Sequence, residues 1–504
     1  MVARVTTVAP VGFDGSIIEV ECDASKSLPS LQIVGLGNKA IDEAKERVRS
    51  AITNSLLDFP KKKITINLAP AELPKDGAHY DLPIAIAILC VSGQLRQAEL
   101  DNAVFAGELA LNGDLRPIRG AINITQLAKQ AGYKNIYLPK QNAEQASLIG
   151  GINIFGIKSL KELFLHLKGE LPVEKYRHTL TNTHTNNDAE LKSPILDEIK
   201  GQEQAKRALI IAAAGHHNIL LSGTPGAGKT MLAKTLSNLL PELTPDEQIE
   251  VTKIHSFAGK IAGEIVKTRP FRSPHHTAST ASIIGGGGNP KPGEVSLAHT
   301  GVLFLDELPE YPRSILESLR QPMEDRKIDV SRANAHVTYP ADFMLVATMN
   351  PCPCGYYGDP TKECTCTSNQ ITSYQKRLSG PLLDRIDMTI NVSRVPNESL
   401  LEKDMLINKQ HLSALDSIKS AISAQEKRYN SRLLYNASLN NRHIKKYANL
   451  SDEAKAMLLS AADKLQLSAR SYFKIIKVAR TIADLDNSNV ISLGHISEAL
   501  QYRG

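Results

Sequence analysis

A glycine-rich octapeptide near the middle of the chain restricts the possible folds more than any other feature. It spans residues 223–230 and reads GTPGAGKT, between an apolar run at 218–222 and a helical pattern at 231–240. In this strand–loop–helix context glycines let the backbone wrap a phosphate, and N–H groups at the helix start point at the anion. The octapeptide therefore predicts a nucleotide site in an α/β domain with a parallel sheet. We expect nucleotide contacts from Gly223, Thr224, Pro225, Gly226, Ala227, Gly228, Lys229, Thr230 and Met231.

Two later apolar runs end in residues that can complete a hydrolytic site. The run at 301–305 precedes Asp306 and Glu307, and the run at 343–349 precedes Asn350. Hydrolysis of a nucleoside triphosphate needs Mg²⁺ ligands and an acceptor that polarises the attacking water. We predict ATP and Mg²⁺ as ligands, with Mg²⁺ on Thr230 and Asp306, Glu307 polarising the water, and Asn350 orienting it. The alternative for Asn350 is an ordinary turn residue.

The composition is that of a folded protein with several domains. At about 150 residues per domain, a chain of 504 residues suggests roughly three domains. The 42% hydrophobic and 22% charged residues exclude a disordered, collagen-like or coiled-coil chain. A net charge of +6 is compatible with a nucleic-acid partner but does not demand one. No apolar run reaches the ~18 residues of a membrane span and no export signal is seen, so we expect a cytoplasmic protein without membrane contact.

Periodicity divides the chain into three domains and a linker. Residues 1–171 alternate short β-branched strands with helices, which predicts an α/β domain. Residues 172–193 are rich in Thr and Asn, which indicates a linker, with a long surface loop as the alternative. Residues 194–395 form a second α/β unit, the nucleotide-binding core. From 396 to 504 the pattern is helical, so we predict an all-α lid.

Four cysteines crowd into a short insertion at residues 350–367. Their spacing is CxC, nine residues, then CxC, and four thiolates so close can complete a tetrahedral Zn²⁺ site. The predicted ligands are Cys352, Cys354, Cys364 and Cys366. Four reduced thiols and redox chemistry are the alternatives. The pair His275 and His276 has no further ligand at fixed spacing, so we expect no metal there.

The nucleotide-site motifs resemble the Walker A, Walker B and sensor-1 elements of AAA+ ATPases. Gly201 and Gln202 lie about 20 residues upstream, where that superfamily has its adenine-side GQ segment. Residues 380–387, GPLLDRID, resemble the LLDRFD segment of the magnesium-chelatase clade, with Ile386 in place of Phe. This implies that Arg385 is an arginine finger acting on a neighbouring subunit, with an ion pair to Asp384 or Asp387 as the alternative.

Three further segments carry the resemblance to that clade. Residues 467–472 resemble a sensor-2 motif, which implies that Arg470 contacts the γ-phosphate in cis; a surface helix arginine is the alternative. Residues 269–294 resemble a helix-2 insert, and 325–339 a pre-sensor-1 β-hairpin. In ring-forming relatives both project into the central channel. DNA contacts are therefore expected from Lys291, Ser331, Arg332 and Asn334, the alternative being a solvated hairpin at a subunit interface.

The N-terminal domain resembles the Lon-type protease fold. Residues 74–83, PKDGAHYDLP, and the later GE and PIRG segments carry this likeness. The register places His79 where the protease has its Ser nucleophile and Ile124 where it has its Lys base. We therefore predict the fold without proteolysis. The run Lys61–Lys63 is a possible phosphate contact, with a solvated charged face as the alternative.

Over essentially its whole length the chain resembles the ComM/YifB-type magnesium-chelatase-like proteins. The segments at 350–359, 380–387 and 468–485 carry the likeness. The resemblance implies a homo-hexameric DNA motor with ATP between subunits, a ring helicase that acts on single-stranded and branched DNA and promotes branch migration of recombination intermediates during natural transformation. The alternatives are a chelatase-like ATPase that remodels a protein or inserts a metal, a Lon-like peptidase, and a non-hydrolysing scaffold.

Overall fold

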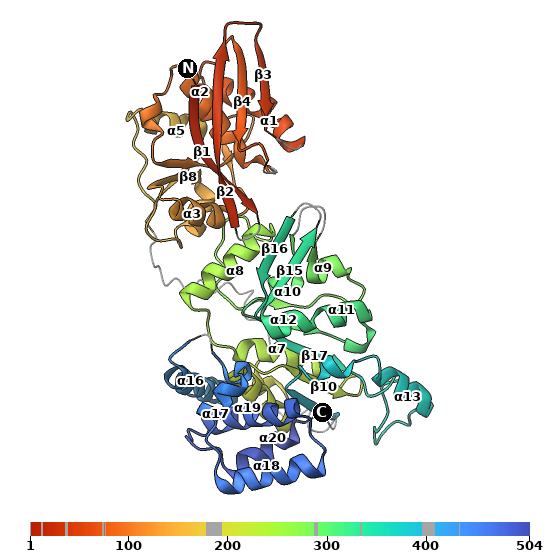
Figure 1. The fold of residues 1–504 in the computed structure, drawn as a ribbon. Helices are drawn as coiled ribbons and strands as arrows, with labels where there is room; N and C mark the ends of the chain where they lie inside the picture. Colours follow the sequence, from red (N-terminus) through yellow and green to blue (C-terminus); the bar gives the residue numbers. More distant parts are fainter. Residues whose placement is uncertain are drawn as a thin grey trace.

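A computed structural model gives the fold of most of the chain. It describes residues 2–11, 14–35, 39–72, 75, 77–177, 194–286, 291–332, 335–395, 409–432 and 434–503. Within these ranges it gives only the backbone of residues 11, 14, 39–42, 331, 332, 335 and 336. The molecule is elongated, with the N-terminal sheet at one end, the second sheet in the middle and a helical region at the other end (Figure 1).

The N-terminal part is built on a seven-stranded mixed sheet with the order β3-β4-β2-β1-β5-β8-β9. Its strands are β1 (Val2–Val11), β2 (Asp14–Ser25), β3 (Ser30–Val34), β4 (Lys63–Ala69), β5 (Ala103–Phe105), β8 (Asn135–Pro139) and β9 (Asn153–Ile157). Helix α2 (Asp81–Val91) is apolar almost throughout, and all but its last residue is buried. This follows from its sequence, because a helix with no polar face must lie inside a core. The remaining elements include α1 (Lys39–Asn54), β6 (Glu108–Leu109), β7 (Leu115–Arg116), α3 (Ala121–Gln130), α4 (Ala143–Ala146) and α5 (Leu160–Leu167).

The central part contains the predicted parallel sheet. Its five strands run in the order β11-β14-β17-β10-β18, and every neighbouring pair is parallel. The strands are β10 (Ile219–Gly223), β11 (Phe271–Arg272), β14 (Val302–Leu305), β17 (Met344–Met349) and β18 (Met388–Val392). All four residues of β14 are buried, as in a sheet covered on both faces. The helices of this part are α6 (Glu203–Gly215), α7 (Lys229–Leu239), α8 (Pro245–Phe257), α9 (Thr280–Ile284), α10 (Glu294–Leu297), α11 (Arg313–Ser318), α12 (Arg320–Asp325), α13 (Ser368–Gln375) and α14 (Gly380–Leu383).

Two small β-ribbons extend from this part at the predicted insert and hairpin. Strands β12 (Gly285–Gly286) and β13 (Lys291–Pro292) pair antiparallel, and so do β15 (Lys327–Arg332) and β16 (Ala335–Pro340). The ribbons are neighbours, because a Cβ on Gly285 would lie 3.3 Å from Cγ2 of Val330. The tips at 287–290 and 333–334 lie outside the described residues.

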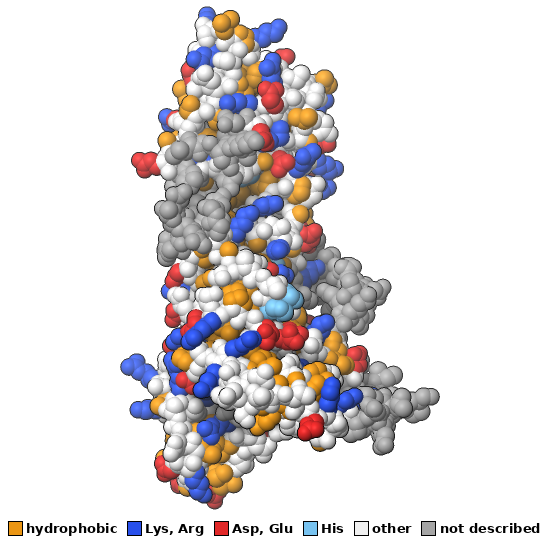
Figure 2. All heavy atoms as spheres, turned by 90° about the vertical axis from the view of Figure 1, so that its right-hand side faces the viewer, with side chains coloured by type: hydrophobic (Ala, Val, Ile, Leu, Met, Phe, Trp, Pro, Cys, Tyr) orange, Lys and Arg blue, Asp and Glu red, His pale blue; other side chains and the backbone are white. Residues whose placement is uncertain are grey.

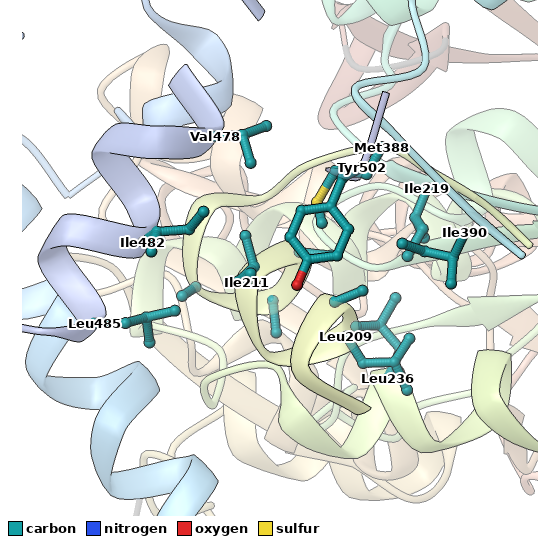
Figure 3. Close-up of a cluster of buried hydrophobic side chains, with 14 of the residues drawn as sticks. Leu209, Ile211, Ile219, Leu236, Met388, Ile390, Val478, Ile482, Leu485 and Tyr502 are labelled. Atoms are coloured by element: carbon teal, nitrogen blue, oxygen red, sulfur yellow. The ribbon is translucent and has the colours of Figure 1, made fainter. Parts of the chain in front are cut away.

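The C-terminal part is helical, as predicted. It contains α16 (Lys409–Tyr429), α17 (Asn441–Tyr447), α18 (Asp452–Lys464), α19 (Ala469–Leu485) and α20 (Leu493–Gln501). Among the described residues its only β-structure is a single bridge between Leu450 and Ile491. Figure 3 shows Val478, Ile482 and Leu485 of α19 gathered with Leu209 and Ile211 of α6 in one buried cluster. The helical region and the central sheet therefore share a hydrophobic core.

The surface has mixed charge. On the face drawn in Figure 2, Lys and Arg side chains are interspersed with Asp and Glu rather than gathered in a broad field of one sign. In the described part of the chain, no helix has both the length and the apolar character needed to cross a membrane.

Candidate nucleotide-binding site

The phosphate loop lies between β10 and α7. Gly226 and Gly228 have φ angles of 80° and 84°, a left-handed conformation that glycine adopts without strain. Helix α7 begins at Lys229, two residues earlier than the sequence pattern indicated. Lys229 and Thr230 therefore lie in its first turn, where backbone N–H groups have no partner within the helix. At the other end of the loop Gly223 is tightly enclosed, since a Cβ there would lie 2.3 Å from the carbonyl oxygen of Val392.

Lys229 connects the phosphate loop to the end of β17. Its Nζ donates hydrogen bonds to the carbonyl of Thr224 at 3.1 Å and to Oδ1 of Asn350 at 3.0 Å. Burial lowers the pKa of Lys229, and the nearby carboxylates of Asp306 and Glu307 oppose this shift. The structure thus brings together four of the residues proposed for hydrolysis.

Thr348 connects the ends of β14 and β17, and the sequence analysis missed it. Its hydroxyl donates to Oδ1 of Asp306 and accepts from the backbone N–H of Glu307 at 3.0 Å. Thr348 is fully buried in a strand that is otherwise apolar. That single hydroxyl in the run 344–349 was the available signal, because a buried hydroxyl needs a partner. Glu307 itself has a φ of 53°, which turns the chain sharply after the strand.

Gln202 attaches the upstream GQ segment to the phosphate loop. Its Nε2 donates to the carbonyl of Ala227 at 2.8 Å and to that of Ser393 at 3.1 Å. Gly201 and Gln202 have φ angles of 59° and 56°. This turn places Gln202 between the phosphate loop and the chain that leaves β18. The GQ segment therefore lies beside the phosphate loop, where its predicted contact with the nucleotide is possible.

Arg385 and Arg470 lie together, on the two sides of Glu324. The guanidinium of Arg385 forms an ion pair with Glu324 on α12 and donates to the carbonyl of Pro381 at 2.7 Å. Nη2 of Arg470 lies 3.6 Å from Oε1 of the same carboxylate. Both arginines line a hollow of about 830 Å³ between the central part and the helical region.

These contacts bear on two predictions. The ion pair of Arg385 with Glu324 replaces the alternative pairing with Asp384 or Asp387; Oδ2 of Asp387 instead accepts from the backbone N–H of Asn218 at 3.0 Å. For Arg470 a cis contact with the phosphates was expected. The structure places Arg470 beside Glu324, and its contact with the phosphates stays a prediction.

The four cysteines of the insertion converge on one point. Their sulfur atoms all lie within 4.8 Å of one another. The Sγ–Sγ distances are 3.3 Å for Cys352–Cys354, 3.7 Å for Cys352–Cys364 and 3.6 Å for Cys354–Cys364. Backbone N–H groups of Tyr356 and Thr365 lower the pKa of the Cys354 thiol, whereas burial and the neighbouring thiols raise the pKa of Cys364 and Cys366. A tetrahedron of thiolates around Zn²⁺, with Zn–S bonds of about 2.3 Å, has edges of about 3.8 Å, so the cluster fits this ion.

The remaining candidates are less well defined. Lys291 is exposed on β13. Ser331 and Arg332 are the last residues of β15, and their side chains, with Asn334, lie outside the described residues. The rings of His275 and His276 lie 4.1 Å apart, and across the described residues the four-cysteine cluster is the only group of three or more candidate metal ligands.

The two positions that replace the protease dyad are both buried in the N-terminal part. Nε2 of His79 lies 3.0 Å from the carbonyl of Val8, and Ile124 is fully buried in α3. An isoleucine cannot act as a base, so these residues do not form a nucleophile–base pair. Lys61 and Lys62 are exposed, which is compatible both with a phosphate contact and with a solvated charged face.

Comparison with known proteins places the chain in a family. Residues 195–400 match the family described as "Magnesium chelatase, subunit ChlI", and 411–503 match "Magnesium chelatase, subunit ChlI C-terminal". Residues 20–142 match "Subunit ChlI of Mg-chelatase". The chain is 43% identical to competence protein ComM of Haemophilus influenzae over 500 residues, which cover 98% of this chain and 96% of ComM. It is also 43% identical to the uncharacterized protein YifB of Escherichia coli over 501 residues, 99% of this chain and 96% of YifB.

The chain belongs to the ComM/YifB-type magnesium-chelatase-like family. The predicted family and the predicted AAA+ fold, an α/β core with a helical C-terminal region, are thereby confirmed. A more distant relative, the magnesium-chelatase 67 kDa subunit of Chlorobaculum parvum, is 28% identical over 157 residues, 31% of this chain and 23% of that subunit. Membership in this AAA+ family indicates an ATPase that uses ATP and Mg²⁺.

Proposed function

We propose that this ComM/YifB-type protein is an Mg²⁺-dependent ATPase that works as a DNA motor. In this proposal six copies form a ring with ATP between neighbouring subunits, and hydrolysis drives branch migration of recombination intermediates. This activity would serve competence, the process for which the Haemophilus influenzae relative, competence protein ComM, is named. The observation that carries the ATPase part is the hydrogen bond between Lys229 and Asn350, which joins the phosphate loop to the polar end of β17.

Each hydrolytic role follows from position and chemistry. Lys229 neutralises the terminal phosphates, and Thr230 and Asp306 hold Mg²⁺. Glu307 accepts a proton from the attacking water or orients it, and Asn350 orients the same water. Mg²⁺ supplies charge neutralisation at the β- and γ-phosphates when bound.

Two arginines complete the site from a neighbouring subunit. Arg385 and Arg470 share Glu324 and line the same hollow, so a neighbour's γ-phosphate entering there would meet two guanidinium groups. This arrangement favours a trans role for Arg470 as well as for Arg385. Glu324 pairs with both cations while no phosphate is bound. The pairing matters more for Arg385, whose side chain is 13% exposed, than for the half-exposed Arg470.

The remaining parts of the proposal concern DNA and zinc. The two neighbouring ribbons, with Lys291 and Arg332 near their tips, face the DNA in the channel and bind its phosphates without reading sequence. The four cysteines hold a structural Zn²⁺, whose tetrahedral geometry their spacing fits. The protein acts in the cytoplasm, where these thiols stay reduced.

The test is the ATPase rate with and without single-stranded DNA. We expect DNA to raise the rate several-fold and Glu307→Gln to abolish it. Arg332→Ala should lower the ratio of DNA-stimulated to unstimulated rate, because it removes a phosphate contact rather than a hydrolytic group. A labelled branched DNA should be resolved into its products only when ATP is present.

A robust ATPase rate that no nucleic acid changes would contradict the motor. The chelatase-like alternative, which remodels a protein or inserts a metal with the same hydrolytic residues, would then explain the activity. Loss of hydrolysis in Glu307→Gln is expected under both readings, so the DNA dependence alone separates them.

A further inference from the structure

The four-cysteine insertion has no hydrophobic core of its own. Between residues 351 and 367 only Cys352 and Gly355 are buried, and most other side chains are exposed. All four cysteines are free, and three of the sulfur pairs are 3.3–3.7 Å apart, well beyond the ~2.05 Å of a disulfide bond. A segment that cannot be held by apolar burial needs a cross-link or a metal to keep one conformation. Because the sulfur spacing fits a metal ion and not a disulfide, we infer that a metal stabilises the conformation of the insertion.

The insertion is also in direct contact with the phosphate loop. Gly355 lies against Pro225, since a Cβ at residue 355 would come within 2.6 Å of two ring carbons of Pro225. Its φ of 85° reinforces the requirement for glycine. The insertion begins with Asn350, whose Oδ1 accepts a hydrogen bond from Lys229. Helix α13 follows the insertion, and Nε2 of Gln375 on this helix donates to the carbonyl of Pro351 at 3.2 Å. The insertion therefore touches the phosphate loop at Pro225 and also carries Asn350.

We propose that the Zn²⁺ held by Cys352, Cys354, Cys364 and Cys366 positions the phosphate loop and Asn350 for ATP binding, through the contact between Gly355 and Pro225. The inference rests on the proposed ATP site but not on any role in DNA. With the metal in place, the turn at Gly355 supports the Pro225 ring, and the bonds of Lys229 to Thr224 and Asn350 hold the same loop. Without it, the insertion loses its one conformation and the loop loses that support.

Two properties test the inference, namely zinc content and affinity for a fluorescent ATP analogue. We expect one zinc per chain by mass spectrometry of the purified protein. The double variant Cys364→Ser/Cys366→Ser should lose the zinc and bind the analogue more weakly. Because both readouts are independent of DNA, a failure of the motor proposal leaves this test intact.

A matched pair of glycines separates positioning from mere stability. Gly355→Ala keeps all four cysteines, so it should retain zinc, but its Cβ meets Pro225 and should weaken nucleotide binding roughly tenfold. Gly358→Ala is the control: Gly358 has a φ of 79° in the same insertion, yet a Cβ there meets nothing within 4 Å. Gly358→Ala should retain both its zinc and its affinity for the ATP analogue. That result would show that backbone strain alone does not weaken nucleotide binding.

Three results would overturn the inference. The first is protein that contains no stoichiometric zinc when purified without chelators. The second is unchanged nucleotide affinity after the zinc has been removed by the cysteine substitutions. The third is equal affinity in Gly355→Ala and Gly358→Ala.

Discussion

Two of the ten non-glycine residues with positive φ in the described part of the chain lie at the nucleotide site. Gln202 and Glu307 both adopt positive φ angles, 56° and 53°, although neither is glycine. Such conformations cost about 1 kcal/mol or more each and persist only where surrounding contacts require them. At Gln202 the strained turn aims the amide at two carbonyls, and at Glu307 it directs the chain away from β14 while the N–H reaches Thr348. The strained backbone at these two residues therefore positions the Gln202 amide and the Glu307 N–H for their hydrogen bonds.

Gln202 provides a test at the residue scale. Replacing it with Gly removes the amide but keeps the left-handed backbone at no cost, whereas Gln202→Ala removes the amide and retains the strain. Because the amide holds Ala227 in the phosphate loop, we expect both variants to bind ATP several-fold more weakly in equilibrium titrations. If Gln202→Gly binds like the unmodified protein, the amide has no role in shaping the loop.

Helix α19 combines an apolar face with a buried ionic network. Asp484 near its end is 1% exposed and accepts from Arg480, Arg428 and Asn436, each with a bond of 2.9 Å. Arg480 is fully buried. Apolar residues of the same helix lie against α6, so the network connects α16 and α19 at the point where the helical region meets the central sheet. The element is thus held by burial on one side and by charge pairing on the other.

We predict that Asp484→Ala destabilises the helical region strongly. The change leaves two buried or largely buried guanidinium groups without their carboxylate, a loss of about 3–5 kcal/mol. Chemical unfolding followed by circular dichroism measures this loss. The control is Asp452→Ala, since Asp452 is 99% exposed and its ion pair with Lys455 should contribute well below ~1 kcal/mol. Similar stability of the two variants would contradict the structural role of the network.

The N-terminal part is fixed to the central part through α8. The Ser256 hydroxyl accepts from the backbone N–H of Gly120 at 3.1 Å and donates to Oε1 of Gln145 at 2.9 Å. Nδ2 of Asn142 donates to the carbonyl of Ala262 at 2.8 Å. Ser256, Asn142 and Gln145 are fully buried. Because buried polar groups are costly without partners, these bonds keep the N-terminal part aligned with the helix that follows α7.

Ser256→Ala should loosen this junction. The substitution leaves the Gly120 N–H and the Gln145 side chain without their shared partner, at a cost of about 1–3 kcal/mol. We expect faster hydrogen–deuterium exchange at residues 118–122, measured by mass spectrometry. Ser497→Ala removes an exposed hydroxyl that bonds only Leu493 of its own helix, and it should leave that exchange unchanged. Unaltered exchange in Ser256→Ala would show that other contacts suffice to hold the junction.

Assembly gives a prediction for the whole molecule. If Arg385 acts on a neighbour, an inactive Arg385→Ala protein and an inactive Glu307→Gln protein should regain ATPase activity when mixed. In mixed rings the first supplies an intact Glu307 and the second an intact Arg385 at the same interface. Persisting inactivity would mean that the arginine acts within its own chain. Arg470→Ala mixed with Glu307→Gln should recover in the same way, because Arg470 shares Glu324 with Arg385.

The sequence by itself determined the local elements of this protein. The phosphate loop, the strand that ends at Asp306 and Glu307, and the convergence of the four cysteines were predicted because each rests on a dense pattern within a few residues. The helical C-terminal region was predicted from a periodicity that runs over many residues. The start of α7 was missed because a left-handed glycine begins that helix in place of a side-chain cap.

Tertiary structure decided how these elements meet. Thr348 bonds Asp306 across 42 residues, Arg385 pairs with Glu324 across 61, and Ser256 bonds Gln145 across 111. Contacts between such distant residues leave no periodicity in the sequence, since each partner alone is an ordinary polar residue. The contact between Gly355 and Pro225 could not be predicted for the same reason. The cysteine insertion lies against the phosphate loop because β17 and β10, the strands that precede them, are neighbours in one parallel sheet.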